Sequence, residues 1–178
     1  MKRKRGGLKT AMEASTSTSH GGRSRDFDVF LSFRGPDSRL TIADSLYNAM
    51  ICAGIRAFKD NEELHVGERI GGGLSQAINE SKIYIPIFSK GYASSKSCLR
   101  ELAQMVDCTR RSADGEQKVI LPIFCDVDAD DVKLKTDLYQ EALQNHKNDS
   151  GEDLVKQWEE ALREVGRIMG KNLKDHGG

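Results

Sequence analysis

A chain of 178 residues is long enough to bury one hydrophobic core without disulfides or a metal, and its basic and acidic side chains are equal in number. Residues 1–25 nevertheless hold seven Lys and Arg against one Glu, which leaves the rest of the chain mildly acidic. A fold of that charge attracts polyanions poorly, so we do not expect a nucleic-acid partner.

Residues 1–25 are basic and rich in Ser and Thr, and we expect a disordered leader. No apolar run there reaches the length of a signal peptide or a membrane span, so we expect a cytoplasmic protein that is neither secreted nor membrane-spanning. Lys2 to Arg5 fits a nuclear address, and the composition has a faint likeness to an organelle transit peptide. A solvated leader with no address is the alternative.

From residue 26 onward, short apolar runs alternate with amphipathic helical patterns, which is typical of βα units around a parallel sheet. The predicted strands are Asp28–Phe33, Ile55–Phe58, Lys82–Phe88 and Lys118–Phe124. The predicted helices follow apolar stripes at 42–50, 74–78, 98–106, 134–143 and 154–169. We therefore predict one α/β domain over 26–170 with an open parallel sheet covered on both faces, and a tail or linker over 171–178.

Individual residues sharpen these predictions. Gly54 should end the first helix, Ser94 and Ser95 should begin the third, and Gly170 should close the last. Trp158 is interpreted as a core anchor. Pro86 and Pro122 fall inside predicted strands, so we expect a bulge or a strand end at each, because proline lacks the N–H of the ladder.

Several sites that bind ions or nucleotides are excluded by their spacing. The glycines at 67 and 71–73 lack the Gly-Lys-Ser/Thr ending of a phosphate loop and predict a glycine-hinged loop. Asp126, Asp128 and Asp130 begin like a calcium loop, but the sixth and twelfth positions do not fit, and a solvated acidic loop is favoured. A phospho-acceptor receiver domain is rejected because Arg34 follows the first strand where acidic residues are needed.

Cysteine and histidine also point away from a metal. The four cysteines lie far apart, each in or beside an apolar stretch, and predict reduced core thiols: Cys52, Cys98, Cys108 and Cys125. The four histidines are scattered, with neither metal-ligand spacing nor a Ser/His/Asp arrangement. We expect no metal site.

Two features remain as candidates for function. The turn from Phe33 to Arg39 places two guanidinium groups at the carboxyl end of a central strand, where open α/β sheets bind ligands. A simple tight turn with Asp37 as N-cap is an equal alternative. Glu101 lies on the flank of the third helix's apolar stripe, where a carboxylate can be half-buried.

These residues belong to a series of motifs that resembles the Toll/interleukin-1 receptor (TIR) domain, in the form found in plant disease-resistance receptors. The motifs, in order, are DVFLSFRGPDSR at 28–39, Phe58, Asp60, Glu63-Leu64, Gly67, Ile70, Leu74, Ala77-Ile78, Ser81, GYASS at 91–95, CLREL at 98–102 and LPIFCDVD at 121–128. The resemblance implies a flavodoxin-like sheet of five parallel strands. It also implies a mobile loop from Asp60 to Ile70 and a short fifth strand near Asn145 to Asp149.

The resemblance further implies an activity in plant defence signalling. Family members cleave NAD+ at the nicotinamide–ribose bond, with NAD+ as substrate and no resident cofactor, and release ADP-ribose products that include cyclic ones. The catalytic glutamate falls on Glu101. The substrate-binding residues implied are Arg34, Gly35, Arg39, Ile70, Ser97 and Cys98.

The implied active site forms only when domains pack together, so the expected partner is another TIR domain, either a second copy or another TIR receptor. One departure bears on activity: the family's usual Trp is Ser97 here, which we expect to weaken turnover. A non-catalytic module that acts by homotypic assembly is therefore the alternative function.

Overall fold

The computed structural model describes residues 27–38, 42–59, 72–112 and 116–173. Its centre is a parallel sheet with the order β2-β1-β3-β5-β6, and β4 also pairs with β3. The strands are β1 (Val29–Phe33), β2 (Ala57–Lys59), β3 (Ile83–Phe88), β4 (Val119–Ile120), β5 (Ile123–Phe124) and β6 (Lys171–Asn172). The predicted α/β class with an open parallel sheet is confirmed.

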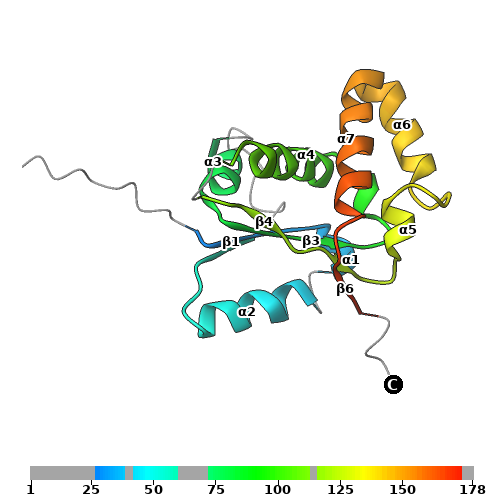
Figure 1. Cartoon of the computed structure of the whole chain (residues 1–178). Helices are drawn as coiled ribbons and strands as arrows, with labels where there is room; N and C mark the ends of the chain where they lie inside the picture. The colour runs from blue at the N-terminus through cyan, green and yellow to red at the C-terminus, as the bar shows by residue number, and fades with distance from the viewer. Residues whose placement is uncertain (1–26, 39–41, 60–71, 113–115, 174–178) are drawn as a thin grey trace, which may run out of the picture.

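Helices cover the sheet unequally (Figure 1). They are α1 (Gly35–Ser38), α2 (Asp44–Cys52), α3 (Gly72–Glu80), the 3-10 turn η3 (Tyr92–Ser94), α4 (Lys96–Arg111), α5 (Ala129–Val132), α6 (Gln140–Ser150) and α7 (Glu152–Val165). In the described part of the chain α3, α4 and α7 lie on one side of the sheet and α2 on the other. No helix among these residues is long and apolar enough to cross a membrane.

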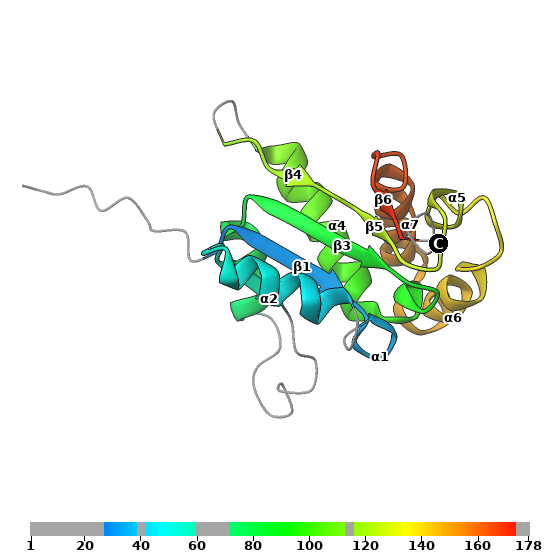
Figure 2. The same ribbon diagram turned by 90° about the horizontal axis from the view of Figure 1, so that it is seen from below.

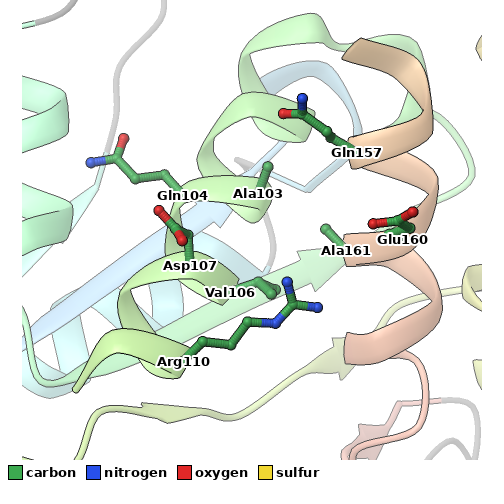
Figure 3. A pocket seen from close by; sticks show the side chains of 8 residues that line it. All are labelled: Ala103, Gln104, Val106, Asp107, Arg110, Gln157, Glu160 and Ala161. Atoms are coloured by element: carbon green, nitrogen blue, oxygen red, sulfur yellow. The ribbon is translucent and has the colours of Figure 1, made fainter. Parts of the chain in front are cut away.

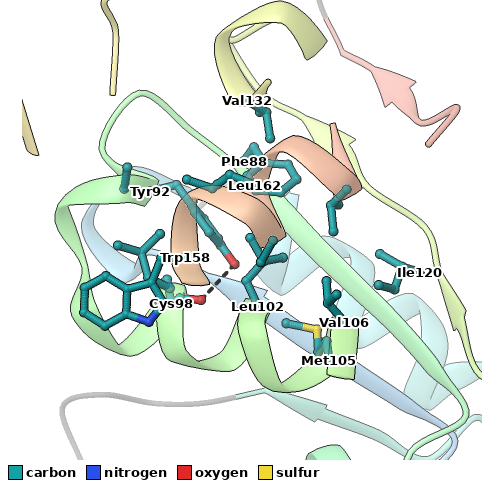
Figure 4. Close-up of a cluster of buried hydrophobic side chains, with 14 of the residues drawn as sticks. Phe88, Tyr92, Cys98, Leu102, Met105, Val106, Ile120, Val132, Trp158 and Leu162 are labelled. Atoms are coloured by element: carbon teal, nitrogen blue, oxygen red, sulfur yellow. Dashed lines mark hydrogen bonds between the residues drawn. The ribbon is translucent and has the colours of Figure 1, made fainter. Parts of the chain in front are cut away.

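Each face of the sheet has its own hydrophobic cluster, because side chains alternate along a strand. The larger cluster lies between the sheet and α3, α4 and α7, and Trp158 at 1% exposure is one of its largest members, as predicted (Figure 4). The smaller cluster lies under α2, which runs along β1 (Figure 2). Beside α2, Val119 and Leu121 are 41% and 46% exposed, so this part of the face stays partly open in the described chain.

The two prolines divide the fourth predicted strand. Leu121 N donates to Tyr84 O, and Cys125 N donates to Phe88 O. The backbone of Pro86, which lies midway between Tyr84 and Phe88 on β3, therefore also faces the segment that holds β4 and β5. Pro86 has no N–H to donate, and the ladder breaks between β4 and β5 opposite it. The expected strand end occurs at Pro122, whereas Pro86 itself stays inside β3, and the interruption falls on its neighbour.

Three predicted elements need correction. Residues 145–149, expected as the fifth strand, are part of α6. The strand that completes this edge of the sheet is β6, at Lys171–Asn172. Of the helix predicted over 134–143, only residues 140–143 are helical, as the start of α6; Leu134, with a positive φ of 61°, and residues 135–139 lie in the loop between α5 and α6. Helix α7 ends at Val165 instead of continuing to Met169, which is 95% exposed.

Two further predictions change in detail. Lys171 and Asn172, placed by the sequence in the C-terminal tail, pair with β5 in the sheet. Of the four cysteines only Cys98 is buried, Cys108 and Cys125 are half-buried, and Cys52 is exposed at the end of α2. None of the four forms a disulfide in the described part of the chain, and the expectation of core positions holds fully for Cys98 alone.

Candidate functional site

The tip of β1 is tied to the tip of β3 by one carboxylate. Asp37 Oδ1 accepts from Arg34 Nη1 at 2.5 Å, and its Oδ2 accepts from Ser89 Oγ at 2.7 Å and from Gly91 N at 3.0 Å. Asp37 is therefore a cross-link and not the helix N-cap considered in the sequence. A Cβ at Gly91 would lie 2.5 Å from Asp37 Oδ2 and 2.8 Å from Arg34 Nη1, so a side chain there would displace this pair.

Helix α4 carries the candidate catalytic carboxylate. Ser95 begins the helix, because its hydroxyl accepts from Cys98 N at 3.2 Å, as the sequence predicted. Six residues further along α4, Glu101 is 4% exposed, more deeply buried than the helical pattern indicated. Ser97 lies one turn earlier and is partly exposed, and its Oγ is 3.3 Å from Glu101 Oε1.

Tyr92 connects this helix to the sheet. Its hydroxyl donates to Cys98 O at 3.3 Å, as Figure 4 shows, and shares a hydrogen bond of 2.8 Å with Ser32 Oγ on β1. Burial raises the pKa of the Tyr92 phenol well above its ordinary value, and the nearby Cys98 and Glu101 raise it further. The phenol therefore stays protonated beside Glu101 and can act as a hydrogen-bond donor.

Helix α6 and the residue before it, Tyr139, support the same segment. Tyr139 donates its hydroxyl to Ser89 O at 2.6 Å, and His146 Nε2 lies 2.9 Å from Ala93 O. The His146 ring also meets the Trp158 ring edge-on at 5.7 Å. The turn between β3 and α4 is thus fixed at both ends, which holds Tyr92 in place against α4.

The residues predicted from sequence are brought only partly together. Arg34 and Gly35 lie at the tip of β1, whereas Ser97, Cys98 and Glu101 lie on α4. The bond between Ser32 and Tyr92 links the two groups. Arg39 and Ile70 lie outside the described residues, as does the predicted loop from Asp60 to Ile70.

Sequence reasoning missed Ser32 and Tyr92, which both have no exposed surface. The available signal was a Ser inside an otherwise apolar strand, because a buried hydroxyl needs a hydrogen-bond partner.

The acidic run after β5 caps the helix that follows it, since Asp128 and Asp131 form a capping box at the N-terminus of α5. The described residues contain no group of acidic, His and Cys side chains that could hold a metal ion.

A pocket of about 430 Å³ lies away from Glu101, between α4 and α7 (Figure 3). Five of its eight lining residues are polar or charged; the full set is Ala103, Gln104, Val106, Asp107, Arg110, Gln157, Glu160 and Ala161. Arg110 in its wall forms an ion pair with Glu164 of α7. None of the site residues predicted from the sequence lines this pocket.

The sequence of residues 26–176 matches the family profile described as the TIR domain. The chain belongs to the TIR domain family. A solved structure of TIR domains, titled as the activated Roq1 resistosome directly recognizing the pathogen effector XopQ, superposes with a TM-score of 0.74 and 37% identity. That match covers 84% of this chain and 89% of the other, so the TIR fold is shown.

Curated relatives include plant disease-resistance proteins. The TMV resistance protein N of Nicotiana glutinosa is 36% identical over 81% of this chain and 12% of the relative. The disease resistance protein RPV1 of Vitis rotundifolia is 36% identical over 91% of this chain and 11% of the relative. The chain thus spans about a tenth of the length of these relatives.

A shorter relative carries an enzymatic name. The probable 2' cyclic ADP-D-ribose synthase BdTIR of Brachypodium distachyon is 39% identical over 114 residues, which are 64% of this chain and 47% of that protein. The relatives of this TIR domain therefore include both proteins named for disease resistance and a protein named as a probable cyclic ADP-ribose synthase.

Proposed function

We propose that this TIR domain cleaves NAD+ at the nicotinamide–ribose bond, with Glu101 as the catalytic residue, and that its products signal plant defence. One observation carries the proposal: a carboxylate only 4% exposed, beside the buried phenol of Tyr92, at the end of the sheet where α/β folds bind ligands. The name of the relative BdTIR supports the same chemistry.

The chemistry explains why one carboxylate suffices. A glycosidase needs a second carboxyl group to protonate a poor leaving group. Nicotinamide leaves NAD+ as a neutral molecule, so no general acid is needed. Glu101 then binds the ribose hydroxyls and stabilises the positive charge that develops at the ribose carbon, and water or a hydroxyl of the substrate itself takes up the ribosyl group.

The other predicted residues receive roles from their positions. Arg34, held by Asp37 at the β1 tip, binds the diphosphate, which suits a planar guanidinium. Ser97, which is partly exposed one turn from Glu101, contacts the substrate, and Gly35 and Cys98 keep the substrate-binding roles that the resemblance implies. Arg39 and Ile70 keep the substrate-binding roles that the resemblance implies. NAD+ is the substrate, and the reaction needs no resident cofactor or metal.

A second candidate function is assembly without catalysis. The family resemblance places an aromatic side chain where this chain has Ser97, and its loss removes a surface on which nicotinamide could stack. The solved relative is titled as a resistosome with TIR domains, which supports homotypic TIR contacts here. In both functions the chain self-associates in the cytoplasm, with Lys2 to Arg5 as a candidate nuclear address.

Turnover by the full chain separates the two functions. Purified protein at several protein concentrations is incubated with NAD+. Nicotinamide release is followed for the unaltered chain and for Glu101→Gln. We expect Glu101→Gln to lose activity by about 100-fold or more, because the charge that stabilises the transition state is removed. Glu160→Gln, a change at an exposed carboxylate on α7, is the matched control and should retain full activity.

The dependence on concentration gives the second criterion. If the site is completed by packing of domains, specific activity rises with protein concentration, and light scattering shows association over the same range. Nicotinamide release that is equal in the unaltered chain and Glu101→Gln would reject Glu101 as the catalytic residue. Association without any nicotinamide release would leave the assembly function in its place.

A further inference from the structure

The pair formed by Ser97 and Glu101 has the geometry of an activated nucleophile. The two residues are one helical turn apart on α4, and Ser97 Oγ lies 3.3 Å from Glu101 Oε1. A hydroxyl within hydrogen-bond reach of a carboxylate base can be deprotonated as it attacks, and such distances are often long before the substrate binds. The carboxylate is 4% exposed, whereas the hydroxyl is only partly buried, so Ser97 is the more accessible member.

We propose that Ser97 is an ADP-ribosyl acceptor, so that the domain modifies itself with its own substrate; this rests on the proposed NAD+ cleavage. The bond between the ribose C1 and the nicotinamide nitrogen breaks, and its electron pair leaves with neutral nicotinamide. A bond forms between C1 and Ser97 Oγ, and the Ser97 proton passes to the Glu101 carboxylate. No oxidant or further reactant is needed, because the serine hydroxyl takes the place of water.

Neighbouring nucleophiles fit this role less well. The thiol of Cys98 belongs to a residue only 1% exposed within the hydrophobic cluster. The Ser95 hydroxyl caps α4 by accepting from Cys98 N. Ser94 is exposed on η3, so labelling of Ser94 would indicate unspecific modification of accessible hydroxyls. The hydrogen bond to Glu101 singles out Ser97 among these side chains.

The modification has a consequence for the site. A serine–ribose bond is an O-glycoside, whose hydrolysis uses one carboxyl group to protonate the oxygen and another to assist at C1, and Glu101 cannot fill both roles at once. The attached ADP-ribose occupies the space in front of Glu101. Nicotinamide release should therefore slow as the label accumulates, which makes the domain self-limiting.

The chain offers a convenient peptide for the test. Trypsin cleaves after Lys96 and Arg100, so Ser97 is the only side-chain hydroxyl in the peptide 97–100. The full chain is incubated with NAD+, digested and analysed by mass spectrometry, while nicotinamide is measured in the same samples. We expect this peptide to gain the mass of one ADP-ribosyl group in step with a falling rate of release.

Variants make the result decisive. Ser97→Ala should lose the label from this peptide, Ser97→Thr should restore it because the hydroxyl returns, and Ser94→Ala should keep it. Nicotinamide release without a label on peptide 97–100 would overturn this inference and leave the proposed function standing. A label of equal amount in Ser97→Ala would also overturn it. Absence of both nicotinamide and label would reject the two proposals together.

Discussion

Glu101 shows how burial at a single residue depends on its neighbours. Its place beside the apolar stripe of α4 predicts partial exposure, yet only 4% of its surface is exposed. Tyr92, in the turn just before α4, lies near it, since its hydroxyl donates to Cys98 O and Glu101 raises the pKa of its phenol. A buried carboxylate with hydrogen-bond donors beside it is typical of a residue kept for chemistry.

Trp158 is the largest fully buried side chain in the larger hydrophobic cluster. It is 1% exposed and meets the His146 ring edge-on, so Trp158→Ala removes a large apolar surface and leaves a cavity. We expect the free energy of unfolding to fall by about 3–5 kcal/mol. Urea denaturation followed by circular dichroism measures it, because Trp158 is the only tryptophan and its fluorescence is lost in the variant.

Met169→Ala is the control for that experiment. Met169 is 95% exposed, and its replacement should change the free energy of unfolding by no more than about 0.5 kcal/mol. Equal effects of the two substitutions would contradict the packing described for α7.

At the scale of elements, the close packing of Gly170 determines how β6 joins the sheet. A Cβ at this position would contact Pro122 O and lie 2.7 Å from Phe124 Cε2. Pro122 O also accepts from Lys171 N at 3.0 Å, which is the first hydrogen bond between β5 and β6. Overpacking against backbone cannot be relieved by a change of rotamer.

We therefore expect Gly170→Ala to destabilise the chain by about 1–3 kcal/mol and to open the β5–β6 pairing first. Hydrogen exchange should show the Lys171 amide losing protection before the amides of β1 and β3. Gly73→Ala is the matched control, because no heavy atom lies within 4 Å of the added Cβ and alanine favours helix. Stability that falls equally in both variants would point to a general effect of the methyl group.

At the scale of the whole molecule, buried phenols limit stability in alkali. Burial raises the pKa of Tyr84, Tyr92 and Tyr139 above the ordinary value, and each hydroxyl is hydrogen-bonded inside the fold. In the unfolded chain these phenols lose their protons near pH 10, whereas the folded chain retains them. Above about pH 10 the unfolded state therefore binds fewer protons, and stability falls as pH rises.

Each phenol contributes about 1.4 kcal/mol per pH unit to this loss, so the three together give a slope of up to about 4 kcal/mol per pH unit above pH 10. Urea denaturation between pH 9 and pH 11 measures the slope. Tyr84→Phe should reduce it by about a third, even though the variant also loses the bond to Ile78 O. A stability that does not change over this range would contradict the burial of these hydroxyls.

The sequence by itself determined the features that local patterns control. Apolar runs correctly predicted the positions of β1, β2 and β3, and Ser95 correctly predicted the start of α4. Gly54, with its positive φ, follows the end of α2, and Trp158 is buried in the core. These outcomes depend on residues a few positions apart, or on whether one side chain prefers water. The motifs resembling the TIR family supplied the roles assigned to the candidate site, and those roles remain predictions.

The tertiary structure alone decided the features that depend on pairing between distant segments. The missing N–H of Pro86 interrupted a neighbouring strand, and β6 formed at Lys171–Asn172 because a sheet edge was available there. Asp37 became a cross-link because the tip of β3 lies beside it. Such contacts join residues dozens of positions apart, and a local sequence pattern does not determine which distant segment will pack beside a given residue.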